Sequence, residues 1–169
     1  MNNEMNQYIV LKKYINKKDY SKIKELEVLC TAKDRVNLKL ELEYKLSISK
    51  NNEEALKDVD EFLYYSDDSL IGYLGISFFG GNAGEINGVV HPDFRRRGIF
   101  KKLYELALQE SRRRGFAKTL LLCDDNSASA IEFIKSCGAA YAFSEYRMRC
   151  LGNAPREING VINLRKAVN

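Results

Sequence analysis

A change of structural period within one short segment constrains this chain more than any other feature. Residues 85–91 are rich in β-branched side chains, and Pro92 forces the residue before it into an extended backbone. From Ile99 onward, apolar residues recur at helical spacing as far as Gly115. The sequence therefore predicts a mostly buried strand, a short turn and an amphipathic helix of roughly 16 residues, about 24 Å long.

The turn between that strand and helix is basic and contains a glycine. It reads Arg95, Arg96, Arg97 and Gly98. The first N–H groups of a helix have no intrahelical partner, and the helix dipole favours an anion beside them. Glycine also allows a ligand to approach the backbone closely. The pattern indicates a diphosphate held by main-chain amides with arginines around it; the alternative is a solvated basic corner that opens an ordinary surface helix.

These residues resemble a known signature. Val90-His91-Pro92, then Arg95-Arg96-Arg97-Gly98-Ile99 and an amphipathic helix, resemble the acyl-CoA signature of the GCN5-related N-acetyltransferases (GNAT). That signature is Gln or Arg, two residues, Gly, one residue, then Gly or Ala. Arg95 and Gly98 match it, whereas Phe100 stands where a small residue is usual. The resemblance covers about residues 72–148.

The resemblance implies an α/β (α+β) fold. We expect a mixed, mostly antiparallel central sheet that splays between its fourth and fifth strands, with helices on both faces. The length of 169 residues and a hydrophobic content of 45% suit one domain over residues 1–169. The predicted strands are 7–13, 62–65, 70–79, 85–91, 118–123 (buried on both faces), 142–149 and 157–168. The predicted helices are 19–31, with Asp19 as its cap, 35–46, 99–114 and 126–137.

The resemblance also implies acetyl-CoA as co-substrate. Main-chain groups at the end of the fourth strand would contact the pantetheine arm or polarise the thioester carbonyl. Asn126 and Ser129 resemble polar cofactor contacts of the family, although Asn126 is equally suited to cap a helix. The expected cofactor-binding residues are Val89, Val90, His91, Arg95, Arg96, Arg97, Gly98, Ile99, Phe100, Lys101, Asn126 and Ser129.

Acetyl transfer to an amine requires a proton acceptor, because a lysine-like amine has a pKa of about 10.4. Glu85 is the candidate general base, since it begins the fourth strand and shares a face with Asn87 and Val89. Catalytic glutamates of several GNAT enzymes stand at a similar offset from the signature. The alternative is a solvated carboxylate after a glycine-rich turn.

The general acid is less clearly marked. Many relatives use a tyrosine in the helix after the fifth strand, but the matching position here is Ile134. Tyr141 and Tyr146 are the nearest substitutes, with Tyr146 the candidate catalytic residue and packing on a strand the alternative for both. Because a thiol pKa is about 8.5, solvent can also protonate the leaving group.

Charge and composition exclude several other functions. Residues 95–118 carry nine Lys or Arg and two acids, a local charge of +7 in a chain of +4. Such a patch suits a phosphorylated cofactor or a nucleic acid, but few aromatic residues lie among the basic ones, so no nucleic-acid partner is expected. No apolar run approaches the roughly 20 residues of a membrane span, and a soluble cytoplasmic protein is expected.

The sequence shows no residues at the spacing that metal ligands usually have. The four cysteines, Cys30, Cys123, Cys137 and Cys150, lack paired metal spacing and are expected to be buried free thiols. Asp124 and Asp125 could invite a metal, but acids at the start of a helix explain them better. No metal site is therefore predicted.

The sequence thus predicts an N-acetyltransferase that transfers an acetyl group from acetyl-CoA to a primary amine of a small molecule or peptide, in a ternary complex. A non-catalytic acyl-CoA sensor is the alternative. The acceptor is not identified, and a homodimer remains open.

Overall fold

The computed structural model describes residues 6–49 and 57–146. These belong to two compact units, the first ending at Ala139 and the second beginning at Ala140. In the second unit, residues 140–146 form no helix or strand, and the Tyr141 hydroxyl lies 2.9 Å from the Ser144 hydroxyl. No helix in the described part of the chain is both long and apolar enough to cross a membrane.

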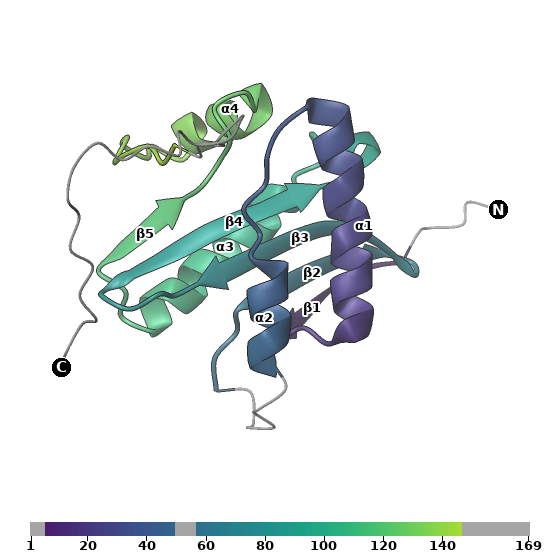
Figure 1. Ribbon diagram of the computed structural model, residues 1–169, viewed down its shortest axis with the longest axis horizontal. Helices are drawn as coiled ribbons and strands as arrows, with labels where there is room; N and C mark the ends of the chain where they lie inside the picture. Colours follow the sequence, from purple (N-terminus) through teal and green to yellow (C-terminus); the bar gives the residue numbers. More distant parts are fainter. Residues whose placement is uncertain (1–5, 50–56, 147–169) are drawn as a thin grey trace, which may run out of the picture. The chain divides into compact units, whose positions relative to one another are not determined.

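The first unit is built on a five-stranded sheet in the order β1-β2-β3-β4-β5 (Figure 1). The strands are β1 (Gln7–Lys12), β2 (Glu61–Ser66), β3 (Ser69–Ser77), β4 (Ala83–Val90) and β5 (Lys118–Leu121). The first four pair antiparallel with their neighbours, and β5 pairs parallel with β4. The mixed, mostly antiparallel sheet is as predicted.

The pairing of β4 with β5 stops half-way along β4. It runs from Ala83 opposite Lys118 to Ile86 opposite Leu121, and the Leu122 amide adds one bond of 3.0 Å to the Ile86 carbonyl. Beyond that point β4 continues to Val90, and among the strands that the structure describes only β3 lies beside it. The predicted splay between the fourth and fifth strands is confirmed.

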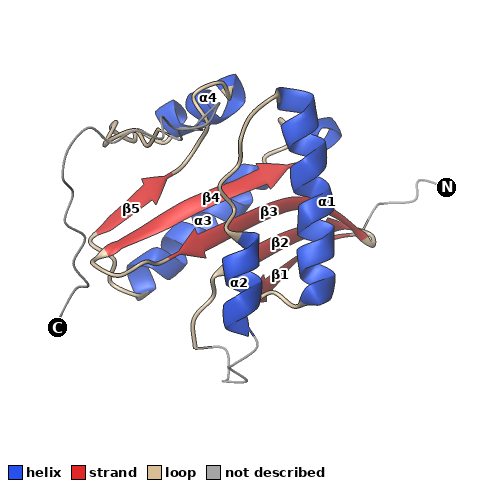
Figure 2. Cartoon of the chain, in the orientation of Figure 1, coloured by secondary structure: helices blue, strands red, loops and turns tan. Residues whose placement is uncertain are grey.

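Helices cover both faces of this sheet, as Figure 2 shows. On one face, α1 (Lys17–Asp34) and α2 (Leu42–Ser49) bury an apolar cluster that includes Ile23, Leu42 and Val89. On the other, α3 (Ile99–Arg113) packs Leu103 and Ala107 against the sheet. A side chain at Gly72 in β3 would come within 2.9 Å of Ile99, so the glycine allows α3 to lie close to the sheet. The remaining helix, α4 (Ala128–Ser136), follows β5.

Two predicted helix starts are wrong. The cap of α1 is Asn16, whose side chain accepts from the Asp19 amide while the Asp19 carboxylate accepts from the Asn16 amide. Asp19 is therefore the third residue of a capping box. In place of a helix from Arg35, α2 begins at Leu42, because Arg35 and Glu41 both adopt a left-handed backbone that a helix cannot contain.

Other expectations fail near the end of the sheet. The residues of β5 are partly exposed rather than buried on both faces, because β5 forms the edge of the sheet that the structure describes. The predicted strand 142–149 is wrong as far as residue 146, and its remainder, like 157–168, lies outside the described residues. Of the described cysteines, which are free thiols, only Cys30 is buried; Cys123 is exposed and Cys137 half-buried, and Cys150 is not described.

Candidate active site

The free edge of β4 presents main-chain groups to the splay. In an antiparallel ladder, successive residues point their N–H and C=O groups to opposite sides. The His91 amide donates to the Ile71 carbonyl of β3 at 2.9 Å, so His91 and Val89 face β3. Gly88 and Val90 therefore face the side that β5 has left. Main-chain contacts to the cofactor are expected from Val89, Val90 and His91. Of these three residues, Val90 is the one whose N–H and C=O groups point into the opening.

The turn after β4 opens α3 with exposed amides. A short 3-10 helix, η1 (Pro92–Phe94), leads to Arg96 and Gly98, both with positive φ, of 61° and 75°. A Cβ atom at Gly98 would meet nothing within 4 Å, so the space over the first turn of α3 is open. The first-turn amides of α3 have no intrahelical acceptor. The turn can therefore receive an anion at its backbone.

The three arginines of this turn have different partners. The Arg95 guanidinium donates to both carboxylate oxygens of Asp34, at 2.8 and 2.6 Å, and its Nε donates to the Val90 carbonyl at 3.1 Å. The Arg96 side chain is 86% exposed, with a long contact of 3.4 Å to Glu132. Arg97 is exposed and lies over the Phe94 ring. Arg96 and Arg97 are thus the two guanidiniums available to a bound diphosphate.

The next three residues of the signature divide between core and surface. Ile99 is buried in the apolar cluster beneath α3, and Lys101 is exposed. Phe100 packs its ring edge-on against Phe133 of α4, with centroids 4.9 Å apart, and comes within 3.1 Å of the position of a Cβ on Gly88. The aromatic residue that departs from the signature therefore joins α3 to α4 beside the splayed strand.

Glu85 lies at the base of the splay. It stands opposite Ser77 of β3 and Leu120 of β5, and it is partly exposed. Its neighbour on the same face, Asn87, is buried and donates through Nδ2 to the Lys39 carbonyl. Within residues 6–49 and 57–146, the Ser77 hydroxyl and the Asn87 Oδ1 have no hydrogen-bond partner. A carboxylate and two polar groups thus gather where the strands separate.

The segment between β5 and α4 is tied to the segment after α1. Asp124 accepts a hydrogen bond of 2.8 Å from the Asn37 amide, and this bond, together with the Asn126 amide, lowers the pKa of the Asp124 carboxyl. Asn126 does not cap α4 as the alternative had it, because Ser127 precedes the helix and the Asn126 amide group donates to Asp124 and Asp125. Ser129 lies exposed in the first turn of α4.

The structure does not place the candidate general acid, Tyr146, relative to this site. Tyr146 is 85% exposed and belongs to the second compact unit, whose position relative to the first is not determined. Ile134, at the position that the family tyrosine occupies, is half-buried in α4. No group of metal-ligating side chains occurs among the residues that the structure describes.

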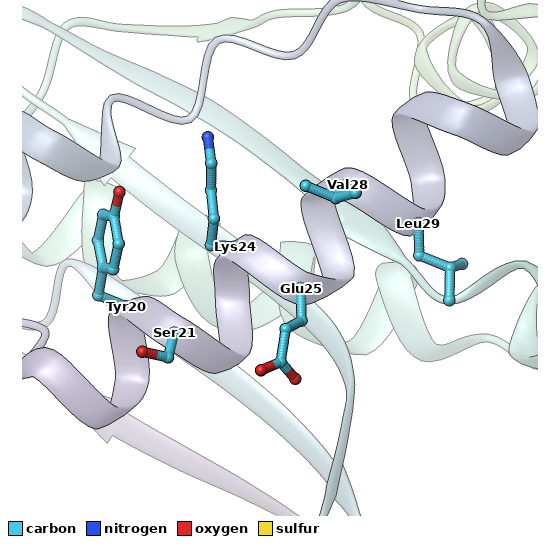
Figure 3. A pocket seen from close by; sticks show the side chains of 6 residues that line it. All are labelled: Tyr20, Ser21, Lys24, Glu25, Val28 and Leu29. Atoms are coloured by element: carbon cyan, nitrogen blue, oxygen red, sulfur yellow. The ribbon is translucent and has the colours of Figure 1, made fainter.

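A shallow hollow elsewhere is not part of the site. It is lined by one face of α1 alone, and Figure 3 shows these side chains projecting from the helix: Tyr20, Ser21, Lys24, Glu25, Val28 and Leu29. None of them comes from β4 or from the turn before α3. The hollow therefore has no connection to the splay.

The comparisons with known proteins agree with this geometry. Residues 22–139 match the model of the acetyltransferase (GNAT) family. The chain belongs to this GNAT family. The match extends well before residue 72, where the recognisable resemblance in the sequence begins, and so takes in most of α1. No curated protein matches the sequence.

Solved structures show the same GNAT fold at low sequence identity. A GNAT acetyltransferase from Staphylococcus aureus Mu50 aligns with a TM-score of 0.62 and 17% identity over 79% of this chain and 84% of that one. A ribosomal-protein-alanine N-acetyltransferase from Brucella melitensis aligns with a TM-score of 0.58 and 17% identity over 85% and 98%. An aminoglycoside acetyltransferase from an uncultured soil metagenomic sample, in complex with sisomicin, aligns with a TM-score of 0.54 and 17% identity over 85% and 96%.

One residue with a clear place in this site is missing from the sequence prediction. Asp34 is the last residue of α1 and lies 61 positions before its partner Arg95. An acid is unfavourable at the C-terminus of a helix, which was the available signal. The sequence does not indicate that Arg95 is the cation that offsets this unfavourable charge.

Proposed function

We propose that this GNAT protein transfers an acetyl group from acetyl-CoA to a primary amine, by direct attack in a ternary complex. The observation that carries the proposal is the separation of β4 from β5 after Ile86, on the strand that leads directly to the open helix start at Gly98. The end of β4 therefore provides a free strand edge that can bind the thioester, and the turn that follows it can bind the diphosphate. In this proposal residues 1–169 act as one catalytic domain.

The residues present suit coenzyme A. Gly98 leaves open space over the first turn of α3, where amides and the exposed Arg96 and Arg97 can bind a diphosphate. Lys101 is exposed one turn further along α3. Acetyl-CoA supplies an activated acetyl thioester whose sulfur is the leaving group. The Val90 amide is then available to the thioester carbonyl.

The chain's own groups would serve the transfer as follows. Glu85 accepts the proton that the attacking amine loses, directly or through a water molecule. The Val90 N–H donates to the carbonyl oxygen as negative charge develops on it. The new C–N bond replaces the C–S bond, and solvent returns a proton to the departing thiolate, whose pKa of about 8.5 makes a dedicated acid dispensable.

A second function has one observation in its favour. Phe100 and Ile134 depart from the family pattern in the turn and at the position of the usual general acid. A protein that binds acyl-CoA without turnover would tolerate both changes. We rank this sensor function second, because a carboxylate at the base of the splay, Glu85, serves proton transfer and is not needed to bind acyl-CoA.

Two measurements test the proposed function in sequence. Calorimetry with acetyl-CoA should detect one binding site per chain. A CoA-release assay over peptides with free amino termini, aminoglycosides and polyamines should then detect turnover with at least one amine. Absence of binding would refute both functions, whereas binding without turnover by any amine would favour the sensor.

A further inference from the structure

We propose that Asp34 is a positioning residue for acetyl transfer: it holds Arg95 against the carbonyl of Val90, so that the Val90 amide faces the splay at a set angle. This inference rests on the proposed function. It assigns to Arg95 a part in orienting the thioester rather than in binding the diphosphate.

The contacts form a continuous strut from α1 to the end of β4. Both terminal nitrogens of Arg95 donate to Asp34, at 2.8 and 2.6 Å, while Nε donates to the Val90 carbonyl at 3.1 Å. The Cys30 thiol of α1 approaches the same carbonyl at 3.4 Å. The guanidinium is planar and its donors are rigidly spaced. Hydrogen bonds from its two terminal nitrogens to one carboxylate therefore fix the direction in which Nε donates. The Val90 carbonyl, which lies one peptide unit after the Val90 amide, is thereby held from the α1 side, and this restrains the backbone of Val90.

The placement of Asp34 is unfavourable by itself. It ends α1, where the helix dipole disfavours a negative charge. The residue that follows, Arg35, adopts a left-handed backbone with φ 57° although it is not glycine, a conformation that is unfavourable for residues with a Cβ atom. The ion pair with Arg95 offsets these two unfavourable features, which the residues next to Asp34 in the sequence do not.

The same end of α1 also holds the opposite side of the splay. Three residues after Asp34, the Asn37 amide donates at 2.8 Å to Asp124, which follows β5. Figure 1 shows the segment after α1 running across β4 toward α2. Both edges of the opening are therefore attached to residues 34–37.

Two roles in the turn can therefore be separated by experiment. Arg96 and Arg97, which are exposed, would control affinity for the diphosphate. Asp34 and Arg95 would control the hydrogen bond from Val90 to the acetyl carbonyl. The variants Asp34→Asn and Arg95→Gln test the strut, and Arg97→Gln serves as the contrasting variant.

The readouts are the Kd of CoA by calorimetry and the carbonyl stretching frequency of bound carbon-13-labelled acetyl-CoA. In the wild type, a hydrogen bond to the carbonyl should lower that frequency relative to free acetyl-CoA. Asp34→Asn and Arg95→Gln should lose most of this shift while the Kd of CoA changes little. Arg97→Gln should weaken CoA binding and keep the shift. Asp58→Asn removes an ion pair with Arg113, which is the last residue of α3 and lies at the opposite end of that helix from Gly98, and should change neither.

The outcomes separate this inference from the proposed function. A wild-type protein that binds acetyl-CoA without a frequency shift contradicts the role of Val90 in the proposed function, and with it the strut. A wild-type shift that survives in both Asp34→Asn and Arg95→Gln overturns the inference alone. So does a loss of CoA affinity in Arg95→Gln as large as that in Arg97→Gln. If Asp34→Asn does not fold, Arg95→Gln decides.

Discussion

The ammonium group of Lys45 lies 2.7 Å from the carboxylate of Glu61, with both side chains almost entirely buried between α2 and the sheet. The Tyr73 hydroxyl donates to the other Glu61 oxygen at 2.6 Å, and Lys45 also donates to the Ile76 carbonyl at 3.1 Å. This network joins α2 to β2 and β3 on the face that carries Glu85. Every charge in it depends on a partner, since a lone buried charge is costly.

We first predict a pH dependence of stability from Glu61. Burial raises the pKa of its carboxyl from 4.5 to about 7. Between those values the folded state holds a proton that the unfolded state has released, so this contribution to stability falls as the pH rises from about 4.5 to about 7. Urea unfolding across this range should show the decline, and Glu61→Gln should reduce it. An unchanged pH slope in Glu61→Gln would contradict this assignment.

Replacement of the other partner should be more damaging. Lys45→Met leaves the Glu61 carboxylate without its cation in the interior, and breaking such a pair costs about 3–5 kcal/mol. The loss should be greatest above pH 7, where Glu61 would otherwise ionise. Urea unfolding at pH 6 and pH 8 measures it. Lys24→Met, which removes a lysine that is 43% exposed and pairs with Glu27 on α1, is the control and should change stability by less than about 1 kcal/mol.

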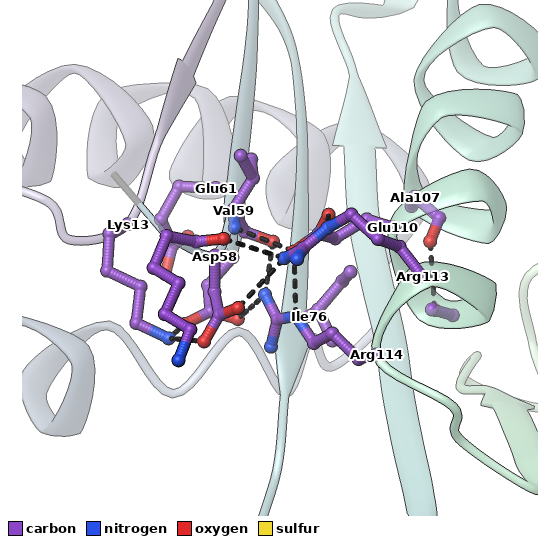
Figure 4. A network of polar contacts seen from close by, with 12 residues as sticks. Lys13, Asp58, Val59, Glu61, Ile76, Ala107, Glu110, Arg113 and Arg114 are labelled. Carbon is purple, nitrogen blue, oxygen red and sulfur yellow. Dashed lines mark hydrogen bonds and ion pairs between the residues drawn. The ribbon is translucent and has the colours of Figure 1, made fainter. Parts of the chain in front are cut away.

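Glu110 should provide resistance to acid. Figure 4 shows its carboxylate among Arg113, Arg114 and the Val59 amide, with contacts of 2.7–2.9 Å. The hydrogen bond from Arg113, with help from Val59 and Arg114, lowers the pKa of Glu110 from 4.5 to about 2. Its contribution is therefore complete above pH 4.5 and is lost as the pH falls toward about 2.

The variant Glu110→Gln isolates this effect. It should unfold with about 2 kcal/mol less stability at pH 7, and the difference from wild type should shrink on acidification. Thermal unfolding at pH 7, 4 and 3 provides the comparison. A difference that stays constant over this range would show that the ionised carboxylate is not the stabilising species.

Glu85→Gln should separate catalysis from binding. Loss of general-base assistance lowers turnover by about 10²- to 10⁴-fold, whereas the diphosphate cradle, which begins ten residues later, is unaffected. Steady-state rates with an accepted amine and calorimetry with acetyl-CoA measure the two effects. Equal rates in the variant and the wild type would remove Glu85 from the mechanism.

Gly98 should be required for cofactor binding. Alanine at its φ of 75° costs roughly 1–2 kcal/mol and places a methyl group in the open space above α3. Gly115, after the other end of α3, has φ 72° and equally open surroundings. Gly98→Ala and Gly115→Ala should therefore lose similar stability, but only Gly98→Ala should weaken acetyl-CoA binding. Comparable affinities in the two variants would mean that the ligand does not approach residue 98.

Much of the fold follows from local patterns. The change of period around Arg95 to Gly98 predicts β4, the turn and α3 correctly, because burial of one face imposes that period on the sequence. The start of α2 was not predictable in this way. Leu38, Leu42 and Leu46 share helical spacing, but the left-handed backbone at Glu41 separates the first leucine from the helix.

The candidate site likewise has one part that the sequence predicted and another that it did not. The sequence alone determined the family signature, the basic turn and the position of Glu85 on β4, since these depend on residues that are close together in the chain. Packing in three dimensions was needed to show which main-chain amide faces the splay and that Arg95 pairs with Asp34. Pairing register and contacts across 61 residues arise from the packing of α1 against the sheet, and no local pattern encodes them.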